Sequence, residues 1–216
     1  MAGYPTTNNA VATGFGGQIG IFFQNQAGFK LGASYKTKQQ FSDFKFENTY
    51  LDNSRSENSF KMNFPAIYSL GFGYSNSKLD FACDFRQVEY SKTEGFQEYG
   101  WSPTAAVKGF GWSDMQIVSI GAQYKGIKKL PLRVGYTYNT NPIKSELTFF
   151  SASATAVIQN AYQFGFGYEF SKKLTLNTVY HYGKSGGSTE GPIYNPMLAG
   201  QTNPLGSVPN SKVSYK

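Results

Sequence analysis

Large apolar side chains recur at every second position through much of this sequence, most regularly in the segment AYQFGFGYEF at residues 161–170. A period of two is that of a β-strand, because successive side chains point to opposite faces of a sheet. One face of this segment is aromatic, whereas the other carries small or polar residues. The same alternation predicts further strands at residues 15–23, 29–35, 68–74, 79–85, 118–124, 132–138 and 174–182. The chain is therefore expected to be all-β.

The links between these segments alternate in length. Successive hairpins are closed by short turns at residues 24–28, 75–78, 125–129 and 171–173. The hairpins are joined by long links rich in Gly, Ser and Asn, at approximately residues 37–63, 91–113, 140–160 and 183–212. Such long loops are uncommon inside compact soluble domains, while short turns at one end and long loops at the other are typical of an outer-membrane β-barrel. We therefore predict a transmembrane antiparallel β-barrel, with about eight meandering strands in this chain.

Composition indicates which solvent each face of the sheet meets. Charged residues make up 15% of the chain, against about 25% in a typical soluble domain, and the mean hydropathy is −0.40. No run approaches the roughly 18 apolar residues of a membrane-spanning helix. The face opposite the aromatics is mostly Gly, Ser, Gln, Asn and Thr, not the Lys and Glu of a water-exposed surface. We expect the aromatic face to meet lipid and the other to line a wet lumen, a soluble all-β domain being the alternative.

The counts of reactive residues argue against several classes of site. The single cysteine, Cys83, rules out an intramolecular disulfide framework, and the single histidine, His181, argues against a histidine metal site or a Ser-His-Asp triad. Asp80 and Asp84 lie roughly 13 Å apart along one strand face, too far for a paired-carboxylate acid–base site. The net charge of +7 comes from scattered Lys and Arg, which does not favour a nucleic-acid partner. We expect no catalytic residue, no metal site and no cofactor.

A few charged side chains fall on the positions that should face the lumen. We expect Asp80 and Asp84 to form ion pairs with Arg86 and Arg133 across neighbouring strands, since charges inside barrels pair. The alternative is that Arg133 or Lys30 receives the carboxylate of a ligand, which a planar guanidinium can hold at two oxygens.

Two of the long links, residues 95–112 and 147–158, are apolar for segments that should face outside water. In one interpretation these loops pack on each other and cap the barrel. In the other they form a groove for a hydrophobic ligand, because exposed apolar patches mark contact sites. Such a groove would bind by burying alkyl chain, at about 0.8 kcal/mol per CH₂ group. Its lining would be Phe96, Trp101, Phe110, Trp112, Phe149 and Phe150.

The segment GWSDMQIVSIGAQYKGIKKLPLRVGYTYNTNPI, residues 111–143, resembles the FadL family of outer-membrane transporters for long-chain fatty acids and other hydrophobic compounds. The matching features are Trp-x-Asp entering a strand, Ile-Gly-Ala-x-Tyr, a short turn, and Leu-Arg-x-Gly-Tyr-x-Tyr followed by Asn-Pro-Ile. The hairpins at residues 64–85 and 162–183 fit the same family, so the resemblance covers most of residues 14–183.

The resemblance implies a fourteen-stranded barrel plugged by an N-terminal hatch, of which this chain corresponds to the C-terminal portion. Residues 1–13 would then be an N-terminal segment, residues 14–183 the barrel portion, and residues 184–216 a long loop with the start of a truncated last strand. The opening residues MAGYPTTNNA have neither a basic nor an apolar stretch of a signal peptide. We expect either that an export signal has been removed or that the chain belongs to a longer protein.

The function implied by the resemblance is passive uptake of long-chain fatty acids or other hydrophobic compounds through the outer membrane of a Gram-negative bacterium. The expected partners are a hydrophobic small molecule, the lipid and lipopolysaccharide of that membrane, and detergent in vitro, with the chain as a monomer. The alternative is a small barrel without transport activity that has a structural or surface-binding role.

Overall fold

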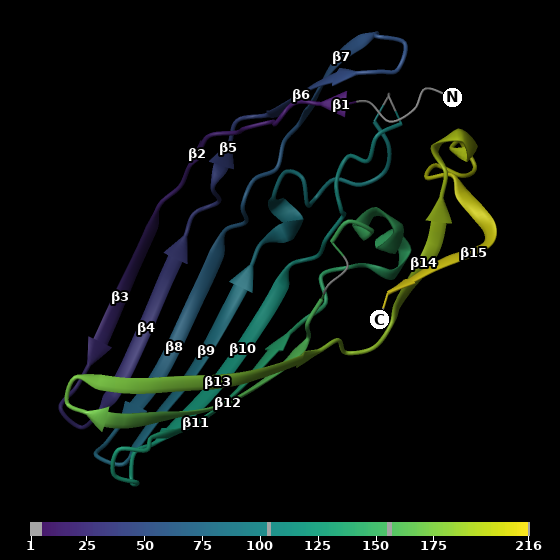
Figure 1. Ribbon diagram of the computed structural model, residues 1–216. Coiled ribbons are helices and arrows are strands. Elements are labelled where there is room, and N and C mark those ends of the chain that lie inside the picture. Colours follow the sequence, from purple (N-terminus) through teal and green to yellow (C-terminus); the bar gives the residue numbers. More distant parts are fainter. Residues whose placement is uncertain (1–5, 103–104, 155–156, 216) are drawn as a thin grey trace.

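The computed structural model describes residues 6–102, 105–154 and 157–215. Its main element is one antiparallel sheet in the strand order β13-β12-β11-β10-β9-β8-β4-β3 (Figure 1). These strands are β3 (Gln18–Gln24), β4 (Phe29–Lys36), β8 (Ile67–Ser75), β9 (Leu79–Val88), β10 (Met115–Tyr124), β11 (Leu132–Asn139), β12 (Asn160–Ser171) and β13 (Leu174–Lys184). The meander predicted from the alternation is confirmed.

The predicted strand at residues 15–23 is interrupted near its start. β2 (Gly14–Phe15) leaves the main sheet and pairs with β5 (Gln40–Phe41), and β3 begins only at Gln18. Gly17 lies at the break, where its N–H donates to Thr37 Oγ1 and its carbonyl accepts from the Thr37 N–H, each at 2.9 Å. These bonds fix Gly17 to Thr37 at the end of the β3–β4 pairing, and they separate β2 from β3.

The sheet curves into a trough, but it does not close (Figure 1). β3 and β13 are its two edges, and they do not pair with each other in the described part of the chain. The prediction of a barrel is therefore correct for the antiparallel meander and wrong for closure within this chain. The diameter of a barrel grows with its number of strands. A sheet whose curvature matches a wider barrel therefore covers only part of the circumference and stays open.

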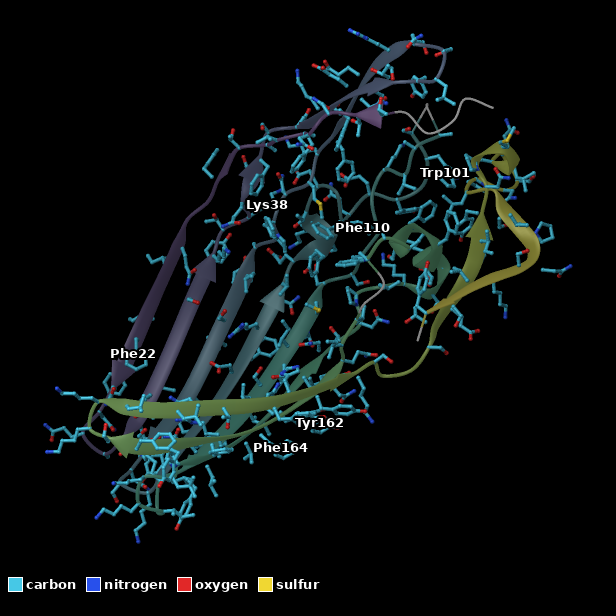
Figure 2. All side chains as sticks on the ribbon, in the orientation of Figure 1. Phe22, Lys38, Trp101, Phe110, Tyr162 and Phe164 are labelled. Carbon is cyan, nitrogen blue, oxygen red and sulfur yellow. The ribbon has the colours of Figure 1, made fainter. Side chains whose placement is uncertain are left out.

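The register of the sheet separates two kinds of side chain onto two faces. One face, here called the outer face, carries apolar rows such as Phe23, Leu31, Phe72, Cys83, Ile120, Tyr136, Tyr162 and Tyr182. The other, here called the lumen face, carries rows such as Lys30, Gly73, Ala82, Gly121, Gly135, Gln163 and His181. The predicted alternation of the two faces is confirmed. Figure 2 labels Tyr162 and Phe164, both on the outer face.

The long links fold into a layer at the end of the strands opposite the short turns, here called the loop layer (Figure 1). It contains a small sheet of β1 (Thr6–Thr7), β6 (Phe44–Thr49) and β7 (Arg55–Phe60), the 3₁₀ turns η1 (Tyr90–Lys92), η2 (Ser145–Ser151) and η3 (Pro196–Leu198), and the hairpin of β14 (Thr189–Tyr194) and β15 (Ser207–Tyr215). None of the helical segments in the described ranges is long and apolar enough to cross a membrane.

The end of the chain joins the loop layer and not the main sheet. β15 contains most of the segment SKVSYK and pairs with β14, while β13 extends to Lys184. The division at residues 13 and 183 into an N-terminal segment, a barrel portion and a final loop stays a prediction.

Two long links are tied together at the base of the loop layer by Asn63, which is 2% exposed. Its side-chain oxygen accepts from the Phe41 N–H at 2.8 Å, and its amide donates to Glu94 Oε2 at 2.8 Å. The same carboxylate oxygen accepts from Lys38 Nζ at 2.9 Å. The bonds from Lys38 and Asn63 hold the pKa of Glu94 at about 2, below its usual value of 4.5.

The buried apolar core also lies in the loop layer. Leu147, Phe150 and Tyr194 form a buried cluster against which Trp101, Phe149 and Leu205 pack. The main sheet buries little by comparison, because its outer face has no protein layer over it. The loop layer is thus packed like a small soluble domain, whereas the sheet is one layer thick.

Candidate functional site

A polar network crosses the lumen face near the short turns. Asp80 lies at its centre: Oδ1 accepts from Ser75 Oγ at 2.6 Å and from Lys125 Nζ at 2.7 Å, and Oδ2 accepts from Gln123 Nε2 at 2.9 Å. Lys30 joins through its ammonium group, which donates to Ser75 Oγ at 3.1 Å. Because several donors already satisfy Asp80, this carboxylate holds strands together and is not available to a ligand.

Arg133 continues the network toward the β13 edge. Its Nε donates to Gln123 Oε1, and its Nη1 donates to Asn177 Oδ1 at 2.9 Å. The expected ion pair of Arg133 with Asp80 is wrong, because the register places Gln123 between them, as the cross-strand partner of both. The amide bridges the two charged groups in place of direct contact.

The expected ion pairs of Asp84 and Arg86 are also wrong. Asp84 has Gly71 and Ser119 as cross-strand neighbours, and Arg86 has Ser69 and Ile117. No cross-strand neighbour carries the opposite charge, and no ion pair or side-chain hydrogen bond joins either residue to the described residues. The sequence correctly placed both charges on the lumen face but not their partners.

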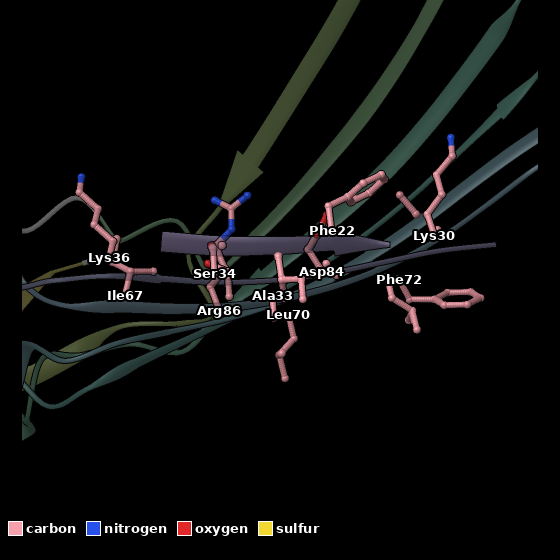
Figure 3. A pocket seen from close by; sticks show the side chains of 18 of the residues that line it. Phe22, Lys30, Ala33, Ser34, Lys36, Ile67, Leu70, Phe72, Asp84 and Arg86 are labelled. Atoms are coloured by element: carbon pink, nitrogen blue, oxygen red, sulfur yellow. The ribbon is translucent and has the colours of Figure 1, made fainter. Parts of the chain in front are cut away.

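An open cavity of about 690 Å³ lies over the lumen face of β3, β4, β8 and β9 (Figure 3). We call it the Arg86 hollow. Phe22, Lys30, Lys36, Asp84 and Arg86 project into it, and its floor is made of small residues that include Gly32, Gly71 and Gly73. Figure 3 shows Phe22, Lys30, Asp84 and Arg86 on one side of the sheet and Leu70 and Phe72 on the other.

Glycine is needed in this floor for space. A Cβ atom added at Gly71 would lie 2.7 Å from Asp84 Oδ1, so any side chain there would displace the carboxylate. Lys30 packs over the neighbouring Gly73, whose added Cβ would lie 3.4 Å from Lys30 Cβ. The glycines therefore let charged side chains lie across the sheet instead of standing on it.

A second hollow of about 450 Å³ lies over β11, β12 and β13. We call it the Arg133 hollow; its lumen-facing lining is Arg133, Gly135, Gln163, Gly165, Asn177 and Val179. The two lumen residues proposed from the sequence are thus separated, because Lys30 is on β4 and Arg133 on β11, about 19 Å apart at the usual strand spacing. They cannot hold one carboxylate between them.

The six aromatic residues proposed to line a loop groove fall into two clusters. Phe96, Phe110 and Trp112 pack together with ring centroids 5.2–5.5 Å apart, and Tyr90 joins them. Trp101, Phe149 and Phe150 form the second cluster around Tyr194. Figure 2 labels Phe110 from the first cluster and Trp101 from the second.

A hydrogen bond joins the two clusters, since Trp112 Nε1 donates to Ser151 Oγ at 2.9 Å. Trp101 Nε1 likewise donates to the Leu205 carbonyl at 2.9 Å. Phe96 and Phe150 are buried, while Trp101, Phe110, Trp112 and Phe149 stay half-buried. The arrangement fits loops that pack on each other, and it leaves four of the six rings partly exposed to a ligand.

Sequence reasoning missed Phe22, Tyr90 and Tyr194. Phe22 stands between two residues assigned to the outer face, and in the run IFF at residues 21–23 the middle residue must face the lumen. This break in the alternation is the sequence signal that places Phe22 on the lumen face. Tyr90 and Tyr194 sit in long links, where no period assigns a face to a side chain.

No cluster of metal ligands accompanies these features. Within residues 6–102, 105–154 and 157–215, no three His, Cys, Asp or Glu side chains come together in a way that could hold a metal ion.

Comparison with known protein families identifies the chain. Residues 6–190 match the family described as outer membrane protein transport protein (OMPP1/FadL/TodX). The chain belongs to this family. It is therefore an outer-membrane protein of a transporter family and not an enzyme, and the resemblance to FadL transporters is confirmed. A comparison with curated proteins gave no match.

Solved structures with a similar fold include the toluene transporter TodX of Pseudomonas putida, at 20% identity and a TM-score of 0.52, with 84% of this chain and 45% of that chain covered. A FadL homologue of Pseudomonas aeruginosa aligns at 17% identity and a TM-score of 0.60, covering 88% of this chain and 47% of that one. The chain thus spans about half the length of these structures. At such identities the likeness establishes the fold of the sheet.

Proposed function

We propose that the curved sheet is the C-terminal portion of the wall of an outer-membrane channel through which hydrophobic molecules, such as long-chain fatty acids, cross by passive diffusion. The observation that carries the proposal is the lumen face. Its glycine rows leave two hollows inside the trough, at β3–β9 and at β11–β13. Polar side chains line both hollows, so the path is wet, but Phe22 and Val179 add apolar surface to each.

The loop layer supplies the first contact for a hydrophobic molecule in this proposal. The half-buried ring edges of Trp101, Phe110, Trp112 and Phe149 lie at the end of the strands where the long loops gather. Weak burial against these edges would concentrate the molecule near the trough, at a gain of about 25 cal/mol per Å² of apolar surface covered. Movement through the channel would then follow the concentration gradient, without a cofactor.

The test is uptake by a Gram-negative host that lacks channels of this family. The chain is expressed with an export signal, and its insertion is checked by protease protection. Initial uptake of radiolabelled toluene and radiolabelled oleate is measured against the empty vector. We expect a severalfold higher rate for at least one of the two. Inserted chain with uptake at the level of the vector would contradict the proposal and favour a structural role.

A matched pair of tryptophan variants separates lumen from membrane effects. Gly121→Trp places a large ring on the lumen face, where an added Cβ meets nothing closer than the Val134 carbonyl at 3.5 Å, and should lower uptake to background. Tyr180→Trp places the same ring on the outer face, where Tyr180 is 65% exposed, and should leave uptake unchanged. Equal effects of the two variants would contradict passage along the lumen face.

A further inference from the structure

Arg86 is the most unusual charged residue of the lumen face. Its cross-strand neighbours Ser69 and Ile117 offer no charge, and it has no hydrogen-bond or ion-pair partner among the described residues. A guanidinium keeps its proton under all ordinary conditions and carries five N–H donors. Arg133, by contrast, already donates to Gln123 and Asn177. Arg86 is thus the guanidinium of the lumen face that is free to hold an anion.

The other charges of the Arg86 hollow favour an anion as well. Lys30 and Lys36 line the hollow together with Arg86, against the single carboxylate of Asp84. Lys30 is held by Ser75 at the end near the short turns, whereas Lys36 and Arg86 lie toward the loop layer. An anion entering from the loop layer therefore meets Lys36 and Arg86 before it meets Asp84.

The opposite wall of the hollow is an aromatic ring. Phe22 is on the lumen face of the edge strand β3 and is 66% exposed. Its neighbour across the pair is Gly32, and a Cβ added there would lie 3.7 Å from Phe22 Cδ2. The Phe22 ring therefore lies over Gly32, and its exposed face is open to a flat molecule. A pair of stacked aromatic rings binds more strongly than expected from the apolar area that it buries.

The width of the hollow selects the size of the ligand. Phe22 on β3 and Asp84 on β9 stand in one cross-strand row, with Gly32 and Gly71 between them. Three strand spacings separate the ends of the row, or about 14 Å between Cα atoms. A ligand in this row must therefore be shorter than about 14 Å, and its carboxylate must point away from Asp84 toward Arg86.

We propose that the Arg86 hollow is a binding site for aromatic carboxylates, with the carboxylate on Arg86 and Lys36 and the ring against the exposed face of Phe22. This site deepens the proposed function and rests on it, because it names the class of molecule that the lumen would favour over neutral hydrocarbons. Arg86 and Phe22 are its specificity-determining residues.

The experiment is a fluorescence binding titration with 2-naphthoate, using the full chain folded in lipid vesicles. Methyl 2-naphthoate serves as the neutral probe and octanoate, as a competitor, serves as the aliphatic acid. Arg86→Gln should lower the affinity for 2-naphthoate about tenfold or more, since it removes a charge-assisted contact. The same variant should change the affinity for the ester less than twofold. Arg133→Gln is the matched control. It should change the affinity for 2-naphthoate less than twofold, because Arg133 belongs to the other hollow.

Two further variants make the result specific. Phe22→Leu should lower the affinity for 2-naphthoate severalfold and leave the affinity for octanoate unchanged, because only the contact between rings is lost. Asp84→Asn should strengthen 2-naphthoate, because it removes the one negative charge of the hollow. Neither Arg86 nor Phe22 is part of the buried core, so both variants should keep the fold, which circular dichroism verifies.

Equal losses for 2-naphthoate and its ester in Arg86→Gln, or equal losses in Arg86→Gln and Arg133→Gln, would overturn the proposal. So would an absence of 2-naphthoate binding to the unaltered folded chain. The titration measures binding alone, so its failure is distinct from failure of the uptake assay, which tests passage of toluene and oleate.

Discussion

The loop layer and the main sheet use the same kind of side chain in opposite ways. Phe150 in the loop layer is 3% exposed and stacks on Tyr194 at a centroid distance of 5.2 Å. Phe164 on the outer face of the sheet is 54% exposed, although it pairs with Val134 and Tyr180 on the neighbouring strands. In the loop layer the protein supplies the apolar surroundings of the ring, whereas on the sheet only the membrane can supply them.

The difference extends to the polar groups. Both tryptophans of the loop layer donate their indole N–H to protein acceptors, so the layer satisfies these two polar atoms itself. The outer face of the sheet carries mainly apolar side chains, together with the hydroxyl groups of tyrosines such as Tyr136 and Tyr162. The buried rings of the loop layer are thus covered by protein, while the exposed rings of the outer face depend on lipid.

The largest expected effect comes from removing a ring of the loop layer. Phe150→Ala should destabilise the layer by about 3–5 kcal/mol, as expected for truncation of a fully packed Phe. The measurement is denaturant unfolding followed by the fluorescence of Trp101, which packs on Phe150 at a centroid distance of 5.3 Å. Phe164→Ala is the control and should leave this transition in place. Similar shifts for both variants would remove the distinction between the two regions.

A charge on the outer face should lower the free energy of unfolding nearly as much as Phe150→Ala does, but only when the chain is in a membrane. Phe166→Lys near the middle of β12 should destabilise the sheet in lipid vesicles by about 2–4 kcal/mol if the site lies at the bilayer midplane. Gln163→Lys, on the lumen face of the same strand, should have little effect. The measurement is urea unfolding of the vesicle-inserted chain. Comparable costs at the two positions would contradict the assignment of the faces.

Acid should loosen the loop layer through Glu94. The folded pKa of about 2 lies below the usual 4.5, so the ionised carboxylate is bound more strongly in the folded state. Its stabilisation is complete above pH 4.5 and is lost as the pH falls toward 2. Near-ultraviolet circular dichroism between neutral pH and pH 2 should show this loss. Glu94→Gln should flatten the acid part of the profile, and an unchanged profile would contradict the role of this carboxylate.

The smallest expected effect is at the tip of the loop layer. Lys45 and Glu57 form an ion pair across β6 and β7 with 3.7 Å between charged atoms, and both side chains are well exposed. A double-mutant cycle with Lys45→Ala and Glu57→Ala should give a coupling of only about 0.2–1 kcal/mol. The same cycle in high salt should reduce it further. A larger coupling would mean that this hairpin is less exposed to solvent than the structure indicates.

The strands of the sheet could be predicted because their signal is local. An alternation such as that of residues 161–170 assigns each side chain to a face without knowledge of any other strand. The pairing of Asp80 could not be predicted in the same way. It depends on the register of three strands, which places Gln123 between Asp80 and Arg133.

The aromatic loop residues show a second limit. Their apolar character was evident in the sequence, but the division into one cluster around Phe96 and another around Phe150 depends on how three separate links meet. Tyr194 lies 44 residues beyond Phe150 in the chain and is its stacked partner. No periodic pattern in a long link predicts a contact over such a distance.

The two free edges of the sheet limit which strands can complete the ring around the lumen. Every pair in the sheet is antiparallel, and the number of strands from β3 to β13 is even, so the two edges run in opposite directions. A set of strands that joins them by antiparallel pairs alone must therefore also be even in number. Lipid offers no hydrogen-bond partners for the outward N–H and C=O groups of β3 and β13. An odd number of added strands would force one parallel pair into a barrel whose other strand pairs are all antiparallel. The six further strands of a fourteen-stranded barrel are even in number and avoid this.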